Sequence, residues 1–153
     1  MKKIFKNFWF IPVIVASIVI VNLFVVRLSV VIGNSMEPTL SNGNIFLTKI
    51  TDEFERYDIV VFENEDMYLV KRVIGCPNET IQIKENMIYI NGEPIKDVVN
   101  VDMKDYGVAS EPILLKDNEY FVLGDNRNDS MDSRMFGPVN TDVILGEKIS
   151  FSY

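Results

Sequence analysis

The clearest hydrophobic pattern in the chain is an apolar stretch close to its N-terminus. Residues 8–26 contain no charged side chain, and three lysines lie among the first six residues. At about 1.5 Å per residue, a helix of this length spans roughly 28 Å, close to the hydrocarbon thickness of a bilayer. The pattern predicts a transmembrane anchor at 8–26, with residues 1–7 in the cytoplasm and an outer domain of residues 27–153.

A secretory signal that is cleaved off is the alternative interpretation of this stretch. Signal peptides have shorter apolar regions, and a small-x-small cleavage site follows them. The sequence Val-Val-Arg-Leu-Ser at residues 25–29 contains no such site. We therefore expect an uncleaved anchor in the plasma membrane, with the lipid bilayer as a partner of the chain.

Beyond residue 27, the apolar positions show the two-residue period of β-strands rather than a helical period. Residues 80–84 alternate strictly between polar and apolar side chains, and Asn91-Gly92 is typical of a tight hairpin turn. The pattern predicts an all-β fold, a coiled antiparallel domain of sandwich or barrel type, with residues 100–112 as a surface loop. Strands are predicted at residues 28–32, 44–48, 58–62, 67–74, 80–84, 87–90, 119–123 and 147–151.

The composition excludes several classes of function. The net charge of −7 argues against a nucleic-acid partner, because phosphate binding needs clustered Lys and Arg. The chain has no histidine, which removes His-based catalytic triads and His-ligated metal sites. Its single cysteine, Cys76, cannot form an internal disulfide. We expect neither a metal nor a cofactor.

A serine shortly after the apolar stretch is the candidate nucleophile. Residues 33–38, Gly-Asn-Ser-Met-Glu-Pro, place Ser35 between a turn-forming pair and a helix-breaking proline, just outside the predicted membrane. A turn serine that bonds the local backbone is the alternative. As a nucleophile, Ser35 needs a neighbouring group that takes its proton, and without histidine the candidates are carboxylates, lysine and tyrosine.

Lys71 is the best-placed base in the sequence, because it interrupts the apolar strand predicted at 67–74. On a two-residue period, Lys71 shares its face with Leu69 and Val73, while Arg72 points the other way. A lysine on a covered face is desolvated, which lowers its pKa and favours the neutral, proton-accepting form. A lysine that protects a strand edge from aggregation is the alternative, and this stretch does not distinguish the two.

The polar stretch at residues 124–137 is bracketed by glycines and follows a predicted apolar strand. A calcium loop is one interpretation, but the stretch lacks the ligands and the invariant glycine that such a loop needs at fixed positions. We interpret it as a structured loop with an Asp132–Arg134 charge pair and with hydroxyls that can bind a lysine nitrogen.

Taken together, these stretches resemble the type I signal peptidases. The short span between Lys71 and Gly124, and the end of the chain at Tyr153, resemble the compact form found in Gram-positive bacteria. The resemblance implies a Ser-Lys peptidase on a coiled all-β fold. The matching blocks follow the apolar stretch in the order of the family, at residues 33–40, 57–62, 70–75 and 124–134.

The resemblance also implies a role for each residue of the site. Ser35 matches the nucleophile, and Lys71 matches the general base that later returns its proton to the leaving amine. Ser130 matches the hydroxyl that orients the lysine nitrogen. Asp132 and Arg134 match the ion pair that holds the loop around that hydroxyl.

The oxyanion hole and the substrate groove are implied in the same way. The Ser35 N–H matches one oxyanion donor. Gly33 lies where some relatives carry a second donor on a serine hydroxyl, and glycine has none, so a backbone group or water must supply the second donor or the oxyanion hole is weaker. The implied substrates are preprotein signal peptides with small residues at the first and third positions before the cut. The residues implied to contact them are Ile32, Met36, Leu69 and Val70.

We therefore predict a membrane-bound serine endopeptidase that removes signal peptides from exported preproteins. A relative with the same dyad that processes pilin or conjugation precursors is the alternative enzyme. A membrane-tethered β module without activity is the non-enzymatic alternative, and the presence of both Ser35 and Lys71 argues against it.

Overall fold

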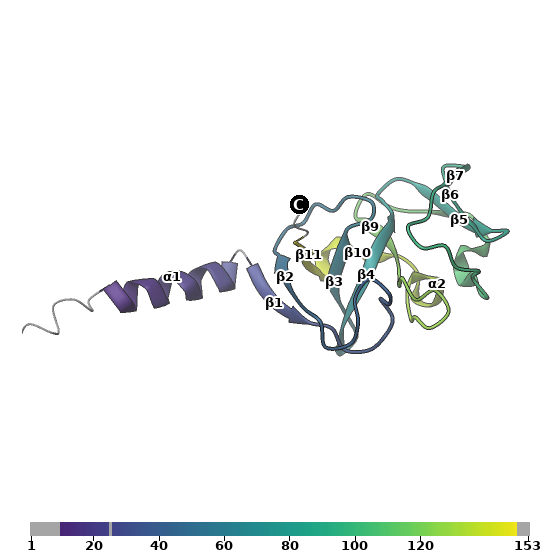
Figure 1. The fold of residues 1–153 in the computed structure, drawn as a ribbon. Helices are drawn as coiled ribbons and strands as arrows, with labels where there is room; N and C mark the ends of the chain where they lie inside the picture. The colour runs from purple at the N-terminus through teal and green to yellow at the C-terminus, as the bar shows by residue number, and fades with distance from the viewer. Residues whose placement is uncertain (1–9, 25, 150–153) are drawn as a thin grey trace, which may run out of the picture.

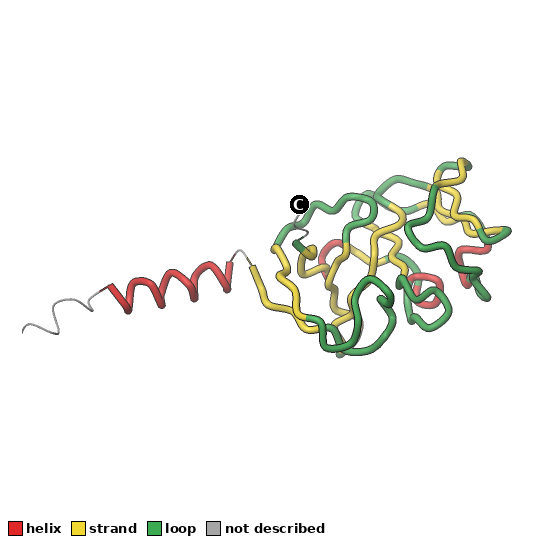
Figure 2. The backbone as a smooth tube through the Cα atoms, in the orientation of Figure 1, coloured by secondary structure: helices red, strands yellow, loops and turns green. Residues whose placement is uncertain are grey.

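The computed structural model describes residues 10–24 and 26–149, and most of its regular structure is antiparallel β-sheet (Figure 1). The prediction of a mainly β, antiparallel fold is thus confirmed. A larger group of strands lies next to the N-terminal helix, and a smaller group lies at the opposite end of the molecule (Figure 2).

The apolar N-terminal stretch forms helix α1, Phe10–Phe24, which extends away from the strands in Figure 1. In the part of the chain that the structure describes, no helix combines the length and the apolarity needed to cross a membrane. Phe8 and Trp9, the first residues of the predicted anchor, lie outside the described residues. The predicted end of the anchor at Val26 is wrong, because this residue begins a strand and pairs with Lys49.

The larger sheet has seven strands, and each neighbouring pair is antiparallel. The last strand of the domain, β11, lies between β2 and β3, so long-range pairing joins the two ends of the domain in one sheet. In spatial order the strands are β1 (Val26–Val30), β2 (Ile45–Lys49), β11 (Ile144–Lys148), β3 (Ile59–Asn64), β4 (Met67–Gly75), β9 (Glu119–Leu123) and β10 (Val139–Asn140).

The smaller sheet contains four strands in the order β7 (Glu93–Ile95), β6 (Met87–Ile90), β5 (Thr80–Lys84) and β8 (Ile113–Leu114). The predicted alternation in β5 is confirmed, because Ile81 and Ile83 are fully buried. The turn that follows β6 has positive φ at Asn91 and Gly92, as the predicted tight hairpin requires. Short helical turns complete the fold at η2 (Gly107–Ser110), α2 (Ser133–Phe136) and η3 (Thr141–Val143).

Strand β4 is the central element for the site because its two edges are paired differently. One edge pairs with β3 from Met67 to Arg72. The other edge pairs with β9 only from Arg72 to Gly75. In the described chain, the first half of β4 therefore keeps one backbone edge free of strand partners.

Buried apolar side chains form three clusters around this strand. The first lies between the two sheets and includes Ile74 of β4. The second covers the other face of β4 and includes Val60 and Val73. The third lies beneath the chain that follows β1 and includes Met36. The two faces of β4 thus contribute to separate cores, as the two-residue period requires.

Several boundaries differ from the sequence prediction. The surface loop predicted at 100–112 is partly wrong, because Met103 and Ala109 are buried in the first cluster and η2 forms within it. The last strand begins at Ile144 and ends at Lys148, earlier than predicted, and residues 150 and 151 lie outside the described chain. The short strands β7, β8 and β10 were not predicted, because two or three residues show no readable period.

Candidate active site

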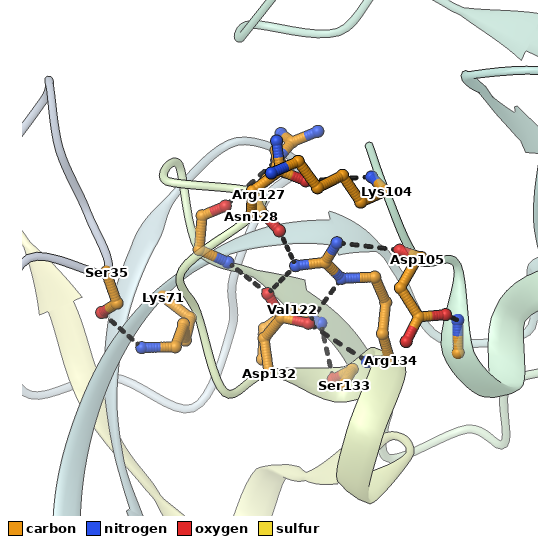
Figure 3. Close-up of polar contacts among 12 residues, drawn as sticks. Ser35, Lys71, Lys104, Asp105, Val122, Arg127, Asn128, Asp132, Ser133 and Arg134 are labelled. Atoms are coloured by element: carbon orange, nitrogen blue, oxygen red, sulfur yellow. Dashed lines mark hydrogen bonds and ion pairs between the residues drawn. The ribbon is translucent and has the colours of Figure 1, made fainter. Parts of the chain in front are cut away.

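Ser35 and Lys71 meet at the surface of the larger sheet, although 36 positions separate them in the sequence. The Lys71 side-chain nitrogen Nζ donates a hydrogen bond to Ser35 Oγ at 2.8 Å (Figure 3). It also donates to the Val70 carbonyl at 3.0 Å. Two bonds thus aim the amine at the hydroxyl, and this is the separation at which a proton can pass between them.

Burial gives Lys71 the properties of a base. Its side chain is 2% exposed, and its strand partner on β3 is the fully buried Val60. Desolvation lowers the pKa of Lys71 to about 8, and the charge of Asp132 acts in the opposite direction. The prediction that Lys71 lies on a covered face is confirmed.

The backbone around Ser35 is fixed by a turn and by a distant amide side chain. Leu40 N–H donates to the Met36 carbonyl at 2.9 Å, which closes the turn that follows the serine. Asn126 donates its backbone N–H to the Ser35 carbonyl at 3.0 Å and its side-chain amide to the Asn34 carbonyl at 3.2 Å. Asn126 therefore clamps the two peptide units that set the direction of the Ser35 side chain.

Gly124 lies where the polar loop meets the Ser35 turn. A Cβ at this position would collide with the Ser130 hydroxyl and with the Ser35 carbonyl, so any larger residue would separate the loop from the serine. The Gly124 N–H donates to Asp132 at 3.0 Å. Ser130 Oγ is buried at this junction and has no hydrogen-bond partner within the described residues, so it does not bond to Lys71.

Asp132 and Arg134 form the ion pair expected from the sequence. Both are buried, and the Asp132 carboxylate accepts bonds from Arg134 Nε and Nη2, each at 2.9 Å. Arg134 also donates to the carbonyls of Arg127 at 2.6 Å and Asp105 at 3.1 Å. The pair is thus a cross-link inside the loop, with further bonds to the chain outside it (Figure 3).

An open groove of about 440 Å³ extends from the dyad along the unpaired edge of β4. Met36 closes its floor at 1% exposed, whereas Ile32 on its rim is 92% exposed. The groove brings together every residue that the sequence suggested for substrate contact. Its lining consists of Val30, Val31, Ile32, Ser35, Met36, Met67, Tyr68, Leu69, Val70 and Lys71.

Comparison with known proteins decides the family. The family pattern "Signal peptidase, peptidase S26" matches residues 3–153. The chain belongs to this family. It is 36% identical to signal peptidase I V of Bacillus subtilis (strain 168), over 92% of this chain and 95% of that protein. It is 33% identical to signal peptidase IB of Staphylococcus aureus (strain Mu50 / ATCC 700699), over 95% of this chain and 87% of that protein.

The structural comparison agrees with the sequence comparison. The crystal structure of a signal peptidase I from Enterococcus faecalis V583 matches with a TM-score of 0.53 and 30% identity. It covers 62% of this chain and 96% of the crystallised chain. The protein is therefore a serine endopeptidase of the signal peptidase I type.

The backbone N–H groups of Ser35 and Gly33, the two residues expected at an oxyanion hole, differ in their partners. The Ser35 N–H has no acceptor within residues 10–24 and 26–149. The Gly33 N–H donates to Asn42 Oδ1 at 3.0 Å, so it is already used. Gly33 also has φ +97°, a left-handed conformation that favours glycine.

Among the described residues of this signal peptidase, no three His, Cys, Asp or Glu side chains converge on one point. The half-buried Cys76 has a pKa raised by burial, which disfavours a reactive thiolate.

Sequence reasoning missed the network beneath the dyad. The buried Asp125 accepts from Arg72 Nε at 2.8 Å and Nη2 at 2.5 Å, and from the Thr39 hydroxyl at 2.5 Å. Asp125 therefore joins the strand of the base to the turn of the nucleophile. Its place inside a charged motif was visible in the sequence, but nothing there distinguished it from the other carboxylates of the loop.

Proposed function

We propose that this signal peptidase cleaves the signal peptides of exported preproteins through a dyad of Ser35 and Lys71. The observation that carries the proposal is the 2.8 Å contact between Lys71 Nζ and Ser35 Oγ at a lysine that is 2% exposed. A buried amine is biased toward its neutral form and can take a proton from a hydroxyl that it touches.

In the first step, Ser35 Oγ attacks the scissile carbonyl while its proton moves to Lys71. The Ser35 N–H, which has no acceptor in the described chain, stabilises the negative oxygen that forms on the carbonyl. The Lys71 ammonium then gives the proton to the leaving amine, and the signal peptide remains attached to Ser35 as an ester. A water molecule gives a proton to Lys71 and attacks the ester. Lys71 returns this proton to Ser35 Oγ as the signal peptide leaves with a free carboxylate, which restores the enzyme.

The polar loop would orient the lysine during these proton transfers. Ser130 Oγ lies buried next to Gly124 and has no hydrogen-bond partner among the described residues. It is therefore the hydroxyl that could accept a bond from the Lys71 amine. Asp132 supports the charged state of Lys71 through its negative charge. We assign Ser130 the orienting role and the Asp132–Arg134 pair the role of fixing the loop.

The substrate would bind as an added strand in the groove. The first half of β4 offers a backbone edge without a strand partner, and an extended peptide can pair with such an edge. The apolar groove lining at Ile32, Leu69 and Val70 and the closed floor at Met36 favour small apolar side chains before the cut.

A membrane anchor completes the proposal. Residues 8–24 contain no charge, and lysines precede them, which favours an N-terminus in the cytoplasm and a catalytic domain outside. The groove is lined by the chain that directly follows β1, so the site would lie close to the point where the anchor ends.

Peptide cleavage by the full chain in detergent tests the dyad. A peptide with an Ala-x-Ala cut site is offered to the wild type and to Ser35→Ala and Lys71→Ala, each of which should lose at least about a hundredfold in kcat/KM. The exposed variants Ser110→Ala and Lys116→Ala are matched controls and should cleave normally. Cleavage that survives Lys71→Ala at neutral pH would sink the dyad, and no cleavage by the wild type would favour a non-catalytic module.

A further inference from the structure

A segment outside the family motifs lies against the polar loop of residues 124–137, which carries Ser130 and which we name the Ser130 loop. We name residues 97–106 the strap; they follow β7 and precede η2. Three of the contacts involve backbone groups of the strap. Lys104 N–H donates to the Asn128 side chain at 2.9 Å, and Arg134 donates to the Asp105 carbonyl at 3.1 Å (Figure 3). The Asn128 side chain also donates to the Asp102 carbonyl at 2.9 Å.

The remaining contact is an ion pair between the side chains of Asp97 and Arg127. Both oxygens of the Asp97 carboxylate accept from the guanidinium, one of them from Arg127 Nη2 at 2.7 Å. The Arg127 side chain is completely buried, whereas that of Asp97 is 20% exposed. Asp97 also borders a second hollow, separate from the groove at the dyad, whose other charged residues are Glu85, Lys96 and Asp102. The Asp97 carboxylate faces Arg127. Asp97 is therefore the carboxylate that compensates this buried cation.

Arg127 transmits this contact to the reacting groups. Its Nε donates to the Gly124 carbonyl at 3.0 Å. Gly124 is the residue whose Cα lies against both the Ser130 hydroxyl and the Ser35 carbonyl. The Arg127 carbonyl also accepts from Arg134 at 2.6 Å. The guanidinium thus fixes the peptide unit on which the loop and the nucleophile turn meet.

We propose that Asp97 is a positioning residue for the peptidase reaction, which acts through Arg127 to hold the Ser130 loop against the Ser35 turn. This inference rests on the proposed dyad. It assigns to the strap, which lies outside the family motifs, control over the alignment of the active site. Asp97 itself does not touch the reacting atoms.

The physical reason is the cost of a buried charge without a partner. When the Asp97 carboxylate is neutralised, the Arg127 guanidinium stays charged and must turn toward water or other acceptors. Its bond to the Gly124 carbonyl then weakens, and the loop moves away from the Ser35 turn. Looser packing also admits water to Lys71, which restores part of its hydration and favours the protonated, inactive form.

The test compares Asp97→Asn with Asp102→Asn in the full chain in detergent, using the same Ala-x-Ala peptide. Asp102 lies on the strap and undergoes the same charge change, but its carboxylate contacts Asn86 rather than the loop. We expect Asp97→Asn to lower kcat about ten- to a hundredfold with little change in KM. The acid limb of the pH profile of Asp97→Asn should move to higher pH. Asp102→Asn should keep the wild-type kcat and the wild-type acid limb. Asp97→Glu, which restores the charge, should recover part of the loss.

A purely structural role would give a different result. A lower melting temperature for Asp97→Asn, with kcat and the acid limb equal to those of Asp102→Asn, would overturn the proposal. If Asp97→Asn does not fold, Arg127→Lys replaces it, because lysine keeps a cation at this position but removes the Nε bond to the Gly124 carbonyl. The same loss in kcat and shift of the acid limb are expected, and unchanged values would overturn the proposal equally.

The outcome also separates this inference from the proposed function. If wild-type cleavage does not depend on Ser35 and Lys71, the dyad fails whatever Asp97 does. If cleavage depends on both residues and Asp97→Asn behaves like its control, the dyad stands and the positioning role of Asp97 alone is wrong.

Discussion

Lys71 and Arg72 are neighbours on β4 that place cationic groups on opposite faces of the sheet. Lys71 is 2% exposed and contacts the hydroxyl of Ser35, and among the described residues no carboxylate bonds to its amine. Arg72 has a side chain that is 12% exposed and bonds both oxygens of Asp125.

The difference shows how one strand can make a base and a structural charge at adjacent positions. On the Lys71 face, the partner on β3 is Val60, so burial is uncompensated by a bonded anion and the neutral amine is favoured. On the Arg72 face, a buried carboxylate compensates a guanidinium that stays charged. Burial without a bonded anion therefore lowers the pKa of Lys71, whereas a bonded carboxylate compensates the charge of Arg72.

Replacing the base by a permanent cation should have the largest effect. Lys71→Arg places a guanidinium, like that of Arg72, on the Lys71 face of β4. A guanidinium cannot accept the Ser35 proton. We expect kcat/KM for an Ala-x-Ala peptide to fall by about 10²–10⁴. Arg72→Lys is the reciprocal variant and should chiefly lower stability. Near-normal cleavage by Lys71→Arg would show that the base lies elsewhere.

The wild-type pH profile should follow the ionisation of Lys71. The pKa of Lys71 is lowered to about 8, and the neutral amine is the active form. Activity should therefore rise with pH through about 8, and each pH unit below that value should cost about tenfold in kcat/KM. Steady-state rates measured between about pH 6 and 9 provide the test. A flat profile over this range would contradict a buried lysine as base.

Removing the partner of Arg72 should destabilise the fold. Asp125→Asn leaves the Arg72 guanidinium with a weaker acceptor and loosens the turn through Thr39. We expect the free energy of unfolding to fall by about 2–4 kcal/mol, measured by denaturant titration. The exposed Asp117→Asn is the control. Equal stability of the two variants would mean that the Arg72–Asp125 pair contributes nothing net.

Removing the Lys71 charge, on the other face of β4, should stabilise the fold instead of destabilising it. The pKa of Lys71 is lower in the folded chain than its ordinary 10.5, so the unfolded chain binds the proton more tightly. Lys71 therefore lowers the free energy of unfolding of the wild type below about pH 8, and this destabilisation disappears as the pH rises toward 10.5.

Lys71→Met should accordingly raise the free energy of unfolding by up to about 3 kcal/mol below pH 8, and the gain should vanish near pH 10.5. Denaturant titrations at several pH values measure the effect, with the exposed Lys84→Met as control. A gain that does not depend on pH would indicate improved packing instead of a removed charge.

The sequence by itself determined the features that depend on neighbouring residues. The two-residue period located most strands of the two sheets and placed Lys71 on a covered face. The absence of histidine reduced the candidate bases for Ser35 to a few residue types. These features are local because strand periodicity and residue chemistry are already present in a short stretch of chain.

Only the tertiary structure decided which distant groups meet. It paired Arg72 with Asp125 rather than with another carboxylate of the loop, placed Asn126 on the Ser35 turn, and engaged the Gly33 N–H with Asn42. It also buried part of residues 100–112, which had looked like a surface loop, and brought Asp97 to Arg127. Such contacts join positions far apart in the chain, and a carboxylate or amide can bond many partners, so only the packing of the sheets selects one.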